Sequence, residues 1–240
     1  MAARTARTRR DRTRVALPIV VAVAAAIVAI VMAVGAGGAP DEAADGAAAD
    51  APRAGDEPAA GPEHRGTGPM AKGDDDAPVV MVMYSEFQCP FCGKFARDTE
   101  PELVERFVDD GTLRIEWRDL PYLGPESLQA AVAGRAAAEQ GGFWELADAL
   151  FADQAPPNSG RLTAEHLVDV ASGLGLDAER FRADLADADL VEAVRADVDE
   201  AVGFGVTGTP AFFVNGQVIM GAQPVEVFVE AIEQAANAAR

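Results

Sequence analysis

Short apolar runs and amphipathic stretches predict the elements of a folded domain in the C-terminal two thirds of the chain. Residues 79–87 read VVMVMYSEF, an apolar run rich in β-branched residues that is typical of a buried strand. Between residues 91 and 108 apolar side chains recur at helical spacing, with a kink expected at Pro101. Residues 112–120 alternate and predict a second strand. Its apolar face consists of Leu113, Ile115 and Trp117.

A long helical block follows the second strand. Residues 128–152 are rich in alanine and predict two helices separated by Gly141-Gly142. Thr163 is a candidate N-cap for a further helix, and two more amphipathic stretches extend the block to about residue 203. His166, in the opening turn of that helix, is interpreted as a helix residue without a catalytic partner.

The chain closes with a predicted hairpin and helix. Two short apolar runs flank Asn215-Gly216, the dipeptide favoured in two-residue type I′ turns. A final amphipathic helix follows from about residue 225. The order strand, helix, strand, helical block, hairpin, helix predicts a mixed sheet with helices on both faces, with the block as an insertion.

An uncharged segment, Val15–Val34, precedes the folded part. As a helix its twenty residues would extend about 30 Å, the thickness of a hydrocarbon core. Residues 1–14 carry six arginines and one acid, so the positive-inside rule predicts a cytoplasmic tail and places the rest of the chain outside the cytoplasm. A cleaved secretory signal, which would leave a secreted protein, is the alternative. Because signal cores run to only about 7–15 apolar residues, we expect a single-pass membrane anchor.

Residues 35–77 are rich in Ala, Gly, Pro and Asp and contain almost no large apolar side chain. Such a segment cannot bury enough surface to offset its ordering entropy, so we predict a disordered linker in which His64 is solvated. From Pro78 onward the chain holds 28 acidic and 11 basic residues, a net charge of −17. This charge argues against nucleic acid or an anionic lipid surface as a partner.

The two cysteines of the chain, Cys89 and Cys92, lie in the segment SEFQCPFCGKF and allow three interpretations. A structural disulfide across so short a loop would contribute about 2 kcal/mol at most. A zinc site needs four ligands, and neither histidine has ligand spacing to the pair, so we expect no metal. The third interpretation, a redox-active pair that needs no further cofactor, is favoured by the local sequence.

Cys89 is predicted at or next to the N-cap of the first helix, with Pro90 at the first helical position, where its missing N–H costs nothing. The helix N-terminus stabilises a thiolate by roughly 0.3–1 kcal/mol, up to ~2 when partly buried, which is enough to lower the pKa of Cys89 by about one unit. Cys89 is then the nucleophile. Cys92, one turn further, is the resolving thiol in exchange through a mixed disulfide.

Three segments resemble, in the same order, the DsbA-like disulfide oxidoreductases of the thioredoxin superfamily, and most closely their membrane-anchored bacterial branch. YSEFQCPFCGKF resembles the active-site stretch, AAAEQGGFWELADALF the inserted helical domain, and GVTGTPAFFVNG the cis-proline loop with its hairpin. The resemblance implies a thioredoxin fold over residues 78–236 with an α-helical insertion at about 124–203. It further implies that Thr209-Pro210 is cis, faces Cys89, and offers its backbone to substrate as an added strand.

The resemblance also implies a function. Such a protein forms disulfides in exported proteins and is reoxidised by a quinone-linked membrane partner. Two alternatives stay open: a disulfide reductase or isomerase, since the direction depends on the redox potential, and a non-catalytic chaperone or binding module with the same fold.

Two neighbours of the cysteines tune the expected chemistry. Phe91 stands where the strongest oxidants of this family have histidine, and it neither donates a hydrogen bond nor carries charge, so we expect a moderate oxidant. Glu86 either raises the thiol pKa by its charge or assists proton transfer from Cys92. The sequence does not separate these two roles.

Overall fold

The computed structural model describes residues 61–66 and 68–240. The predicted cytoplasmic tail (1–14), the predicted membrane-spanning helix (15–34) and most of the predicted linker lie outside the described residues. Within the described ranges, no helix has both the length and the apolar character needed to cross a membrane.

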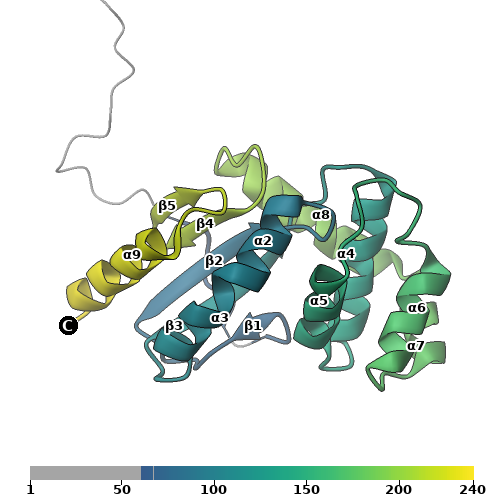
Figure 1. Ribbon diagram of the computed structural model, residues 1–240, viewed down its shortest axis with the longest axis horizontal. Coiled ribbons are helices and arrows are strands. Elements are labelled where there is room, and N and C mark those ends of the chain that lie inside the picture. The colour runs from purple at the N-terminus through teal and green to yellow at the C-terminus, as the bar shows by residue number, and fades with distance from the viewer. Residues whose placement is uncertain (1–60, 67) are drawn as a thin grey trace, which may run out of the picture. The chain divides into compact units, whose positions relative to one another are not determined.

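In the described part of the chain, five strands form one mixed sheet in the order β1-β3-β2-β4-β5 (Figure 1). The central strands β2 (Val79–Ser85) and β3 (Leu113–Asp119) are parallel, as a strand–helix–strand unit requires. β4 (Ala211–Val214) runs antiparallel to β2 and forms the predicted hairpin with β5 (Gln217–Met220). β1 (Ala71–Lys72) is a short antiparallel edge strand on β3.

The turn between β4 and β5 has the predicted type I′ character. Asn215 and Gly216 both adopt positive φ, 44° and 91°. This turn twists in the same sense as the two strands, which explains why the dipeptide predicts the hairpin.

The helix predicted for residues 91–108 is broken near Pro101. α2 (Pro90–Asp98) is followed by α3 (Glu100–Leu103) and by a π-helical turn, η1 (Val104–Val108). Pro101 has no N–H to donate to the carbonyl four residues earlier, and the loss of this hydrogen bond favours a break in the helix there.

The predicted helical insertion is present between β3 and β4. Its helices are α4 (Pro125–Ala138), α5 (Phe143–Ala152), α6 (Ala164–Gly173), α7 (Ala178–Asp184) and α8 (Ala188–Gly203). The side chain of Thr163 accepts a hydrogen bond from the N–H of His166, which confirms the predicted N-cap of α6.

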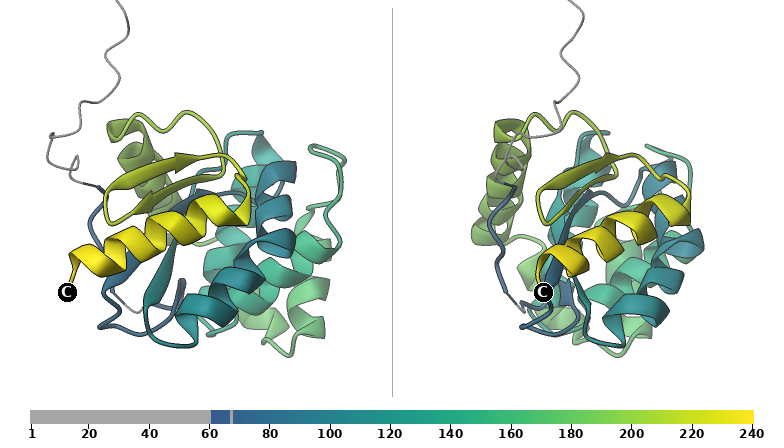
Figure 2. Two further views of the ribbon diagram at one scale, coloured as in Figure 1. Left: turned by 60° about the vertical axis from the view of Figure 1, so that its left-hand side comes forward. Right: turned by 90° about the vertical axis from the view of Figure 1, so that its left-hand side faces the viewer.

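The sheet has an apolar layer on each face, because side chains alternate along β2. Met81 and Met83 belong to the larger core, with residues of α2, α3 and the last helix, α9 (Val225–Ala238). Val82 and Tyr84 belong to a smaller core that includes Ala201 of α8. α9 and α8 therefore lie on opposite sides of the hairpin strands (Figure 2). Helices on both faces were predicted.

The face of β3 that points away from the larger core carries buried charges. Glu116 accepts a hydrogen bond from Arg114 on its Oε1 atom, at 2.9 Å, and another from Arg118 on its Oε2 atom, at 3.0 Å. Arg118 also reaches Glu200 of α8 at 3.2 Å. Asp197 of α8, fully buried, pairs with Arg135 of α4 at 2.5 Å. This ionic network joins the sheet to the insertion.

The prediction that the linker extends to residue 77 is wrong for the part that the structure describes. Arg65 donates from its side chain to Asp197 at 2.5 Å and from its backbone N–H to Glu116 at 2.9 Å. The indole N–H of Trp144 donates to the carbonyl of Ala71 in β1 at 3.1 Å. Composition missed this segment because polar and backbone contacts hold it, with little burial of large apolar side chains. His64 is exposed, as predicted.

Replacing Arg65 by alanine should lower the free energy of unfolding by about 1–2 kcal/mol, since it removes a charge-assisted contact to the buried Asp197. Arg195→Ala, which breaks an exposed pair with Glu192 at 3.5 Å, is the matched control and should cost about 0–0.5 kcal/mol. Urea unfolding of the full chain measures both. Equal effects would contradict the role given to residues 61–77.

Candidate active site

Cys89 ends the loop after β2 and is the N-cap residue of α2, with extended backbone angles (φ −71°, ψ 118°) and Pro90 directly after it. The first helical hydrogen bond runs from the N–H of Gly93 to the carbonyl of Cys89, at 3.1 Å. The predicted positions of Cys89 and Pro90 at the start of this helix are confirmed. The free N–H groups of the first turn therefore point toward the sulfur.

The Thr209-Pro210 peptide bond is cis, as the family resemblance implies. The Sγ atom of Cys89 lies 3.3 Å from the carbonyl oxygen of Thr209, which accepts a hydrogen bond from the thiol. The hydroxyl of Thr209 is buried, and its interaction with the sulfur of Cys89 helps to lower the pKa of this thiol. Thr209 thus offers an acceptor for the thiol and a donor for the thiolate.

Both cysteines are free thiols and both are buried, with 2% of Cys89 and 1% of Cys92 exposed. Their environments differ more than their exposure. A hydrogen bond with Cys92 lowers the pKa of Cys89, and burial opposes this effect. The Thr209 side chain and the N–H groups of Cys92 and Phe91 lower the pKa of Cys89 further. Burial, followed by the interaction with Cys89, raises the pKa of Cys92. These directions assign Cys89 as the nucleophile and Cys92 as the protonated partner.

Glu86 is buried beneath the loop and accepts a short hydrogen bond from Ser127 on its Oε2 atom. Its Oε1 atom has no hydrogen-bond partner within the described residues. Burial raises the pKa of Glu86 to about 7, a hydrogen bond from Ser127 opposes the rise, and the charge of Cys89 adds to it. A carboxyl group in this range is able both to take up and to release a proton near neutral pH.

Two aromatic side chains are exposed beside the cysteine pair. Phe91 is 62% exposed and Tyr122 is 50% exposed. Burial raises the pKa of Tyr122, whose hydroxyl also interacts with Thr209 and Cys89. The side chain of Phe91 has no polar group to offer the thiolate, and only its backbone N–H acts on the sulfur of Cys89.

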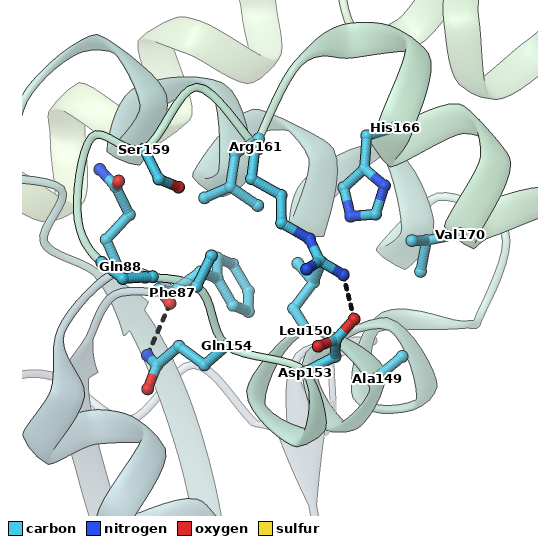
Figure 3. A pocket seen from close by; sticks show the side chains of 13 residues that line it. Phe87, Gln88, Ala149, Leu150, Asp153, Gln154, Ser159, Arg161, His166 and Val170 are labelled. Atoms are coloured by element: carbon cyan, nitrogen blue, oxygen red, sulfur yellow. Dashed lines mark hydrogen bonds and ion pairs between the residues drawn. The ribbon is translucent and has the colours of Figure 1, made fainter.

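Gln154, in the loop after α5, binds the backbone of the active-site loop through two hydrogen bonds. Its Nε2 atom donates to the carbonyls of Phe87, at 2.8 Å, and Cys89, at 3.0 Å (Figure 3 shows the first of these bonds). The contact depends on a glycine, since a Cβ atom at Gly93 would lie 2.3 Å from the Gln154 side-chain oxygen.

A small cavity of about 90 Å³ adjoins Gln154 on the side of the insertion. Phe87 and Leu150 lie on its inner side, and Arg161 and Asp153 form an ion pair across it (Figure 3). His166 lines this cavity from α6, whereas neither cysteine is among its lining residues. Within residues 61–66 and 68–240, no group of three or more His, Cys, Asp and Glu side chains is arranged to hold a metal ion.

Three residues of this site were not predicted from the sequence: Ser127, Gln154 and Tyr122. None lies in a motif, and each reaches the loop from the insertion or from the segment that leads into it. Only Gly93 gave a local signal, as a glycine within a predicted helix next to the cysteine pair. The site as a whole combines a stabilised thiolate, a buried thiol and a buried carboxyl group. These are the parts needed for thiol–disulfide exchange.

Comparison with known proteins agrees with this geometry. A family profile described as Thioredoxin matches residues 66–234. The Na(+)/H(+) antiporter NhaA 3 of Salinispora tropica is 40% identical over 171 residues, which are 70% of this chain and 25% of that protein. The chain thus spans about a quarter of the length of the antiporter relatives that it matches.

A further sequence relative is named for disulfide chemistry, and a solved structure has a similar fold. The probable disulfide bond formation protein D of Bacillus anthracis is 32% identical over 150 residues, which are 61% of this chain and 69% of that protein. BdbD from Bacillus subtilis, in its oxidised crystal structure, superposes with a TM-score of 0.66 and 26% identity over 70% of this chain and 92% of that chain. The matched profile includes the cysteine pair and the cis-proline loop. The chain therefore belongs to the thioredoxin family, among its DsbA-like members, and carries the cysteine pair Cys89–Cys92.

Proposed function

We propose that the chain donates its Cys89–Cys92 disulfide to exported proteins outside the cytoplasm. The environment of Cys89 supports this direction. Hydrogen bonds that lower the pKa of Cys89 stabilise the reduced form of the pair, and a disulfide whose reduced form is stabilised is a better oxidant.

The proposed exchange has two steps. A client thiolate attacks the Sγ atom of Cys89, the bond to Cys92 breaks, and Cys92 leaves as a thiolate that takes up a proton. The client's second thiolate then attacks the client sulfur of the mixed disulfide, and Cys89 leaves as a thiolate. The client gives up two electrons and gains a disulfide, and the enzyme pair accepts those electrons. The low pKa of Cys89 makes it the better leaving group and favours the second step.

We assign Glu86 the transfer of a proton to and from Cys92. Cys92 is buried and its pKa is raised, so its thiolate needs a nearby proton donor as it forms. A pKa of about 7 leaves Glu86 partly protonated at neutral pH.

We assign the cis-proline loop the binding of the client backbone. The carbonyl of Thr209 lies beside the reacting sulfur, so an extended client segment that pairs with this backbone would carry its cysteine to Cys89. Phe91 and Tyr122 offer exposed aromatic surface next to that position, which suits unfolded clients with apolar side chains near their cysteines.

The place of action and the oxidant are proposed from the sequence. The basic tail and the apolar segment 15–34 support a single-pass anchor that leaves the catalytic domain outside the cytoplasm. Such an anchor suits a membrane partner linked to quinone, which would restore the disulfide after each turnover.

The full, oxidised chain is expected to form the disulfide of a reduced two-cysteine peptide, followed by mass change. Cys89→Ser and Cys92→Ser should each reduce the rate to the uncatalysed value, because neither variant can hold a disulfide. Insulin reduction without peptide oxidation would identify a reductase. Equal suppression of client aggregation by Cys89→Ser and the unaltered chain, with no redox activity in either, would identify a binding module.

Titration of the reduced chain by ultraviolet absorbance should show thiolate formation well below the pKa of about 8.5 of free cysteine. Because the folded pKa is the lower one, this thiolate stabilises the folded, reduced protein fully above pH of about 8.5, and the contribution declines as the pH falls toward the folded pKa. Cys89→Ser should remove the low-pH step. A midpoint at or above 8.5 would refute the proposed origin of the oxidising power.

Phe91→His should raise the reduction potential by about 30 mV, equivalent to about 1.4 kcal/mol, because an imidazole adds a donor and a positive charge near the thiolate. Phe91→Leu, which removes the ring without adding a donor, is the control and should leave the potential unchanged. Equilibration with glutathione measures both. An unchanged or lower potential in Phe91→His would show that position 91 does not tune the thiolate.

A further inference from the structure

A buried row of polar groups connects Glu86 to the helical insertion. Gln88 and Ser127 are, like Glu86, almost completely covered, and the row ends at the backbone of Asn158. Gln88 comes from the loop before α2, Ser127 from the first turn of α4, and Asn158 from the segment after α5. Three separate parts of the chain therefore meet beneath the active-site loop.

The backbone N–H of Asn158, at one end of this row, determines which group is the donor in each of the hydrogen bonds that follow. The backbone N–H of Asn158 donates to Oε1 of Gln88 at 2.7 Å, so this atom of Gln88 is the amide oxygen. The Nε2 atom of Gln88 then donates to the hydroxyl oxygen of Ser127 at 2.8 Å. Ser127 has one proton, and it is directed to Oε2 of Glu86.

The two oxygens of Glu86 are therefore not equivalent. Oε2 always faces a donated proton, so it cannot carry a proton of its own toward Ser127. Oε1 is buried and lacks a hydrogen-bond partner within the described residues. The titratable groups that act electrostatically on the carboxyl are Cys89 at the start of α2 and Tyr122 in the segment after β3.

We propose that Ser127 is a positioning residue of the reaction: oriented by Gln88, it keeps Oε2 of Glu86 as an acceptor and confines the transferable proton to Oε1. This inference rests on the proposed function of Glu86. When a client thiolate attacks Cys89 and Cys92 leaves as a thiolate, the proton moves from Oε1 to Cys92. The Ser127 hydroxyl then stabilises the carboxylate that remains, and Oε1 takes the proton back from Cys92 when the pair is reoxidised.

Carboxyl ¹³C titration of Glu86 in the reduced full chain tests the inference without reference to activity. Ser127→Ala should raise the midpoint by about one pH unit or more, since a hydrogen bond to the charged form is lost. Ser127→Thr, which keeps the hydroxyl, should titrate within a few tenths of a unit of the unaltered chain. Ser172→Ala, an exposed serine of α6, is the matched control and should not shift the midpoint. An unchanged midpoint in Ser127→Ala overturns the proposal.

Infrared difference spectra test which oxygen carries the proton. The C=O stretching band of protonated Glu86, assigned by its loss in Glu86→Gln, should move to higher wavenumber in Ser127→Ala, because the carbonyl oxygen Oε2 loses its donor. Gln88→Met, which frees the hydroxyl to rotate, should shift the titration in the same direction by less. An unmoved band, or a downward shift in Gln88→Met, contradicts the assigned donor direction.

The pH profile of client oxidation separates this inference from the proposed function. The profile should follow the Glu86 midpoint in the unaltered chain and in Ser127→Ala, and lose that step in Glu86→Gln. If the profile of Glu86→Gln keeps the step while Ser127→Ala still moves the carboxyl midpoint, the proposed proton transfer fails and the assignment of Ser127 as the group that orients Glu86 stands.

Discussion

The hydrogen bonds that hold the sulfur of Cys89 at the start of α2 are the interaction on which the active site depends. The sheet makes them possible. β4 pairs directly with β2 in a register that places Ala211 opposite Tyr84, so the residues just before β4 and just after β2 meet at one end of the sheet. That meeting brings Thr209 to Cys89 across 120 residues of sequence. The active site therefore needs both segments, because Cys89 comes from one and Thr209, which hydrogen-bonds to it, comes from the other.

The inserted helices are part of this site and do not merely cover it. Ser127 binds the buried carboxyl, and Gln154 binds two backbone carbonyls of the loop that carries the nucleophile. The approach of Gln154 is so close that position 93 has no room for a side chain. Polar contacts of this kind hold a loop in one conformation because a buried group that lost its partner would cost about 1–3 kcal/mol.

A second set of buried polar contacts, between charged side chains, holds the insertion to the face of the sheet that points away from the larger core. Glu116 and Asp197 are each met by two arginines, so neither carboxylate is left buried without a partner. Such pairs contribute little net stability compared with apolar packing but specify one arrangement, since any other would separate them. Through Arg65 the same network fastens the segment before β1 to the sheet and to α8.

Local patterns in the sequence determined most of the elements and the redox pair. Strand alternation, the Asn215-Gly216 turn, the cap at Thr163 and the position of Cys89 before Pro90 all depend on residues within one or two turns of each other, and the structure has all of them. The cis bond at Pro210 followed from resemblance alone. The edge strand, the place of Arg65 and the polar partners of the site were decided by tertiary structure. Ser127 and Glu86 lie 41 residues apart, and Gln154 and Cys89 lie 65 apart. No short-range periodicity selects such partners, because their contacts exist only once the path of the chain has brought the insertion under the loop.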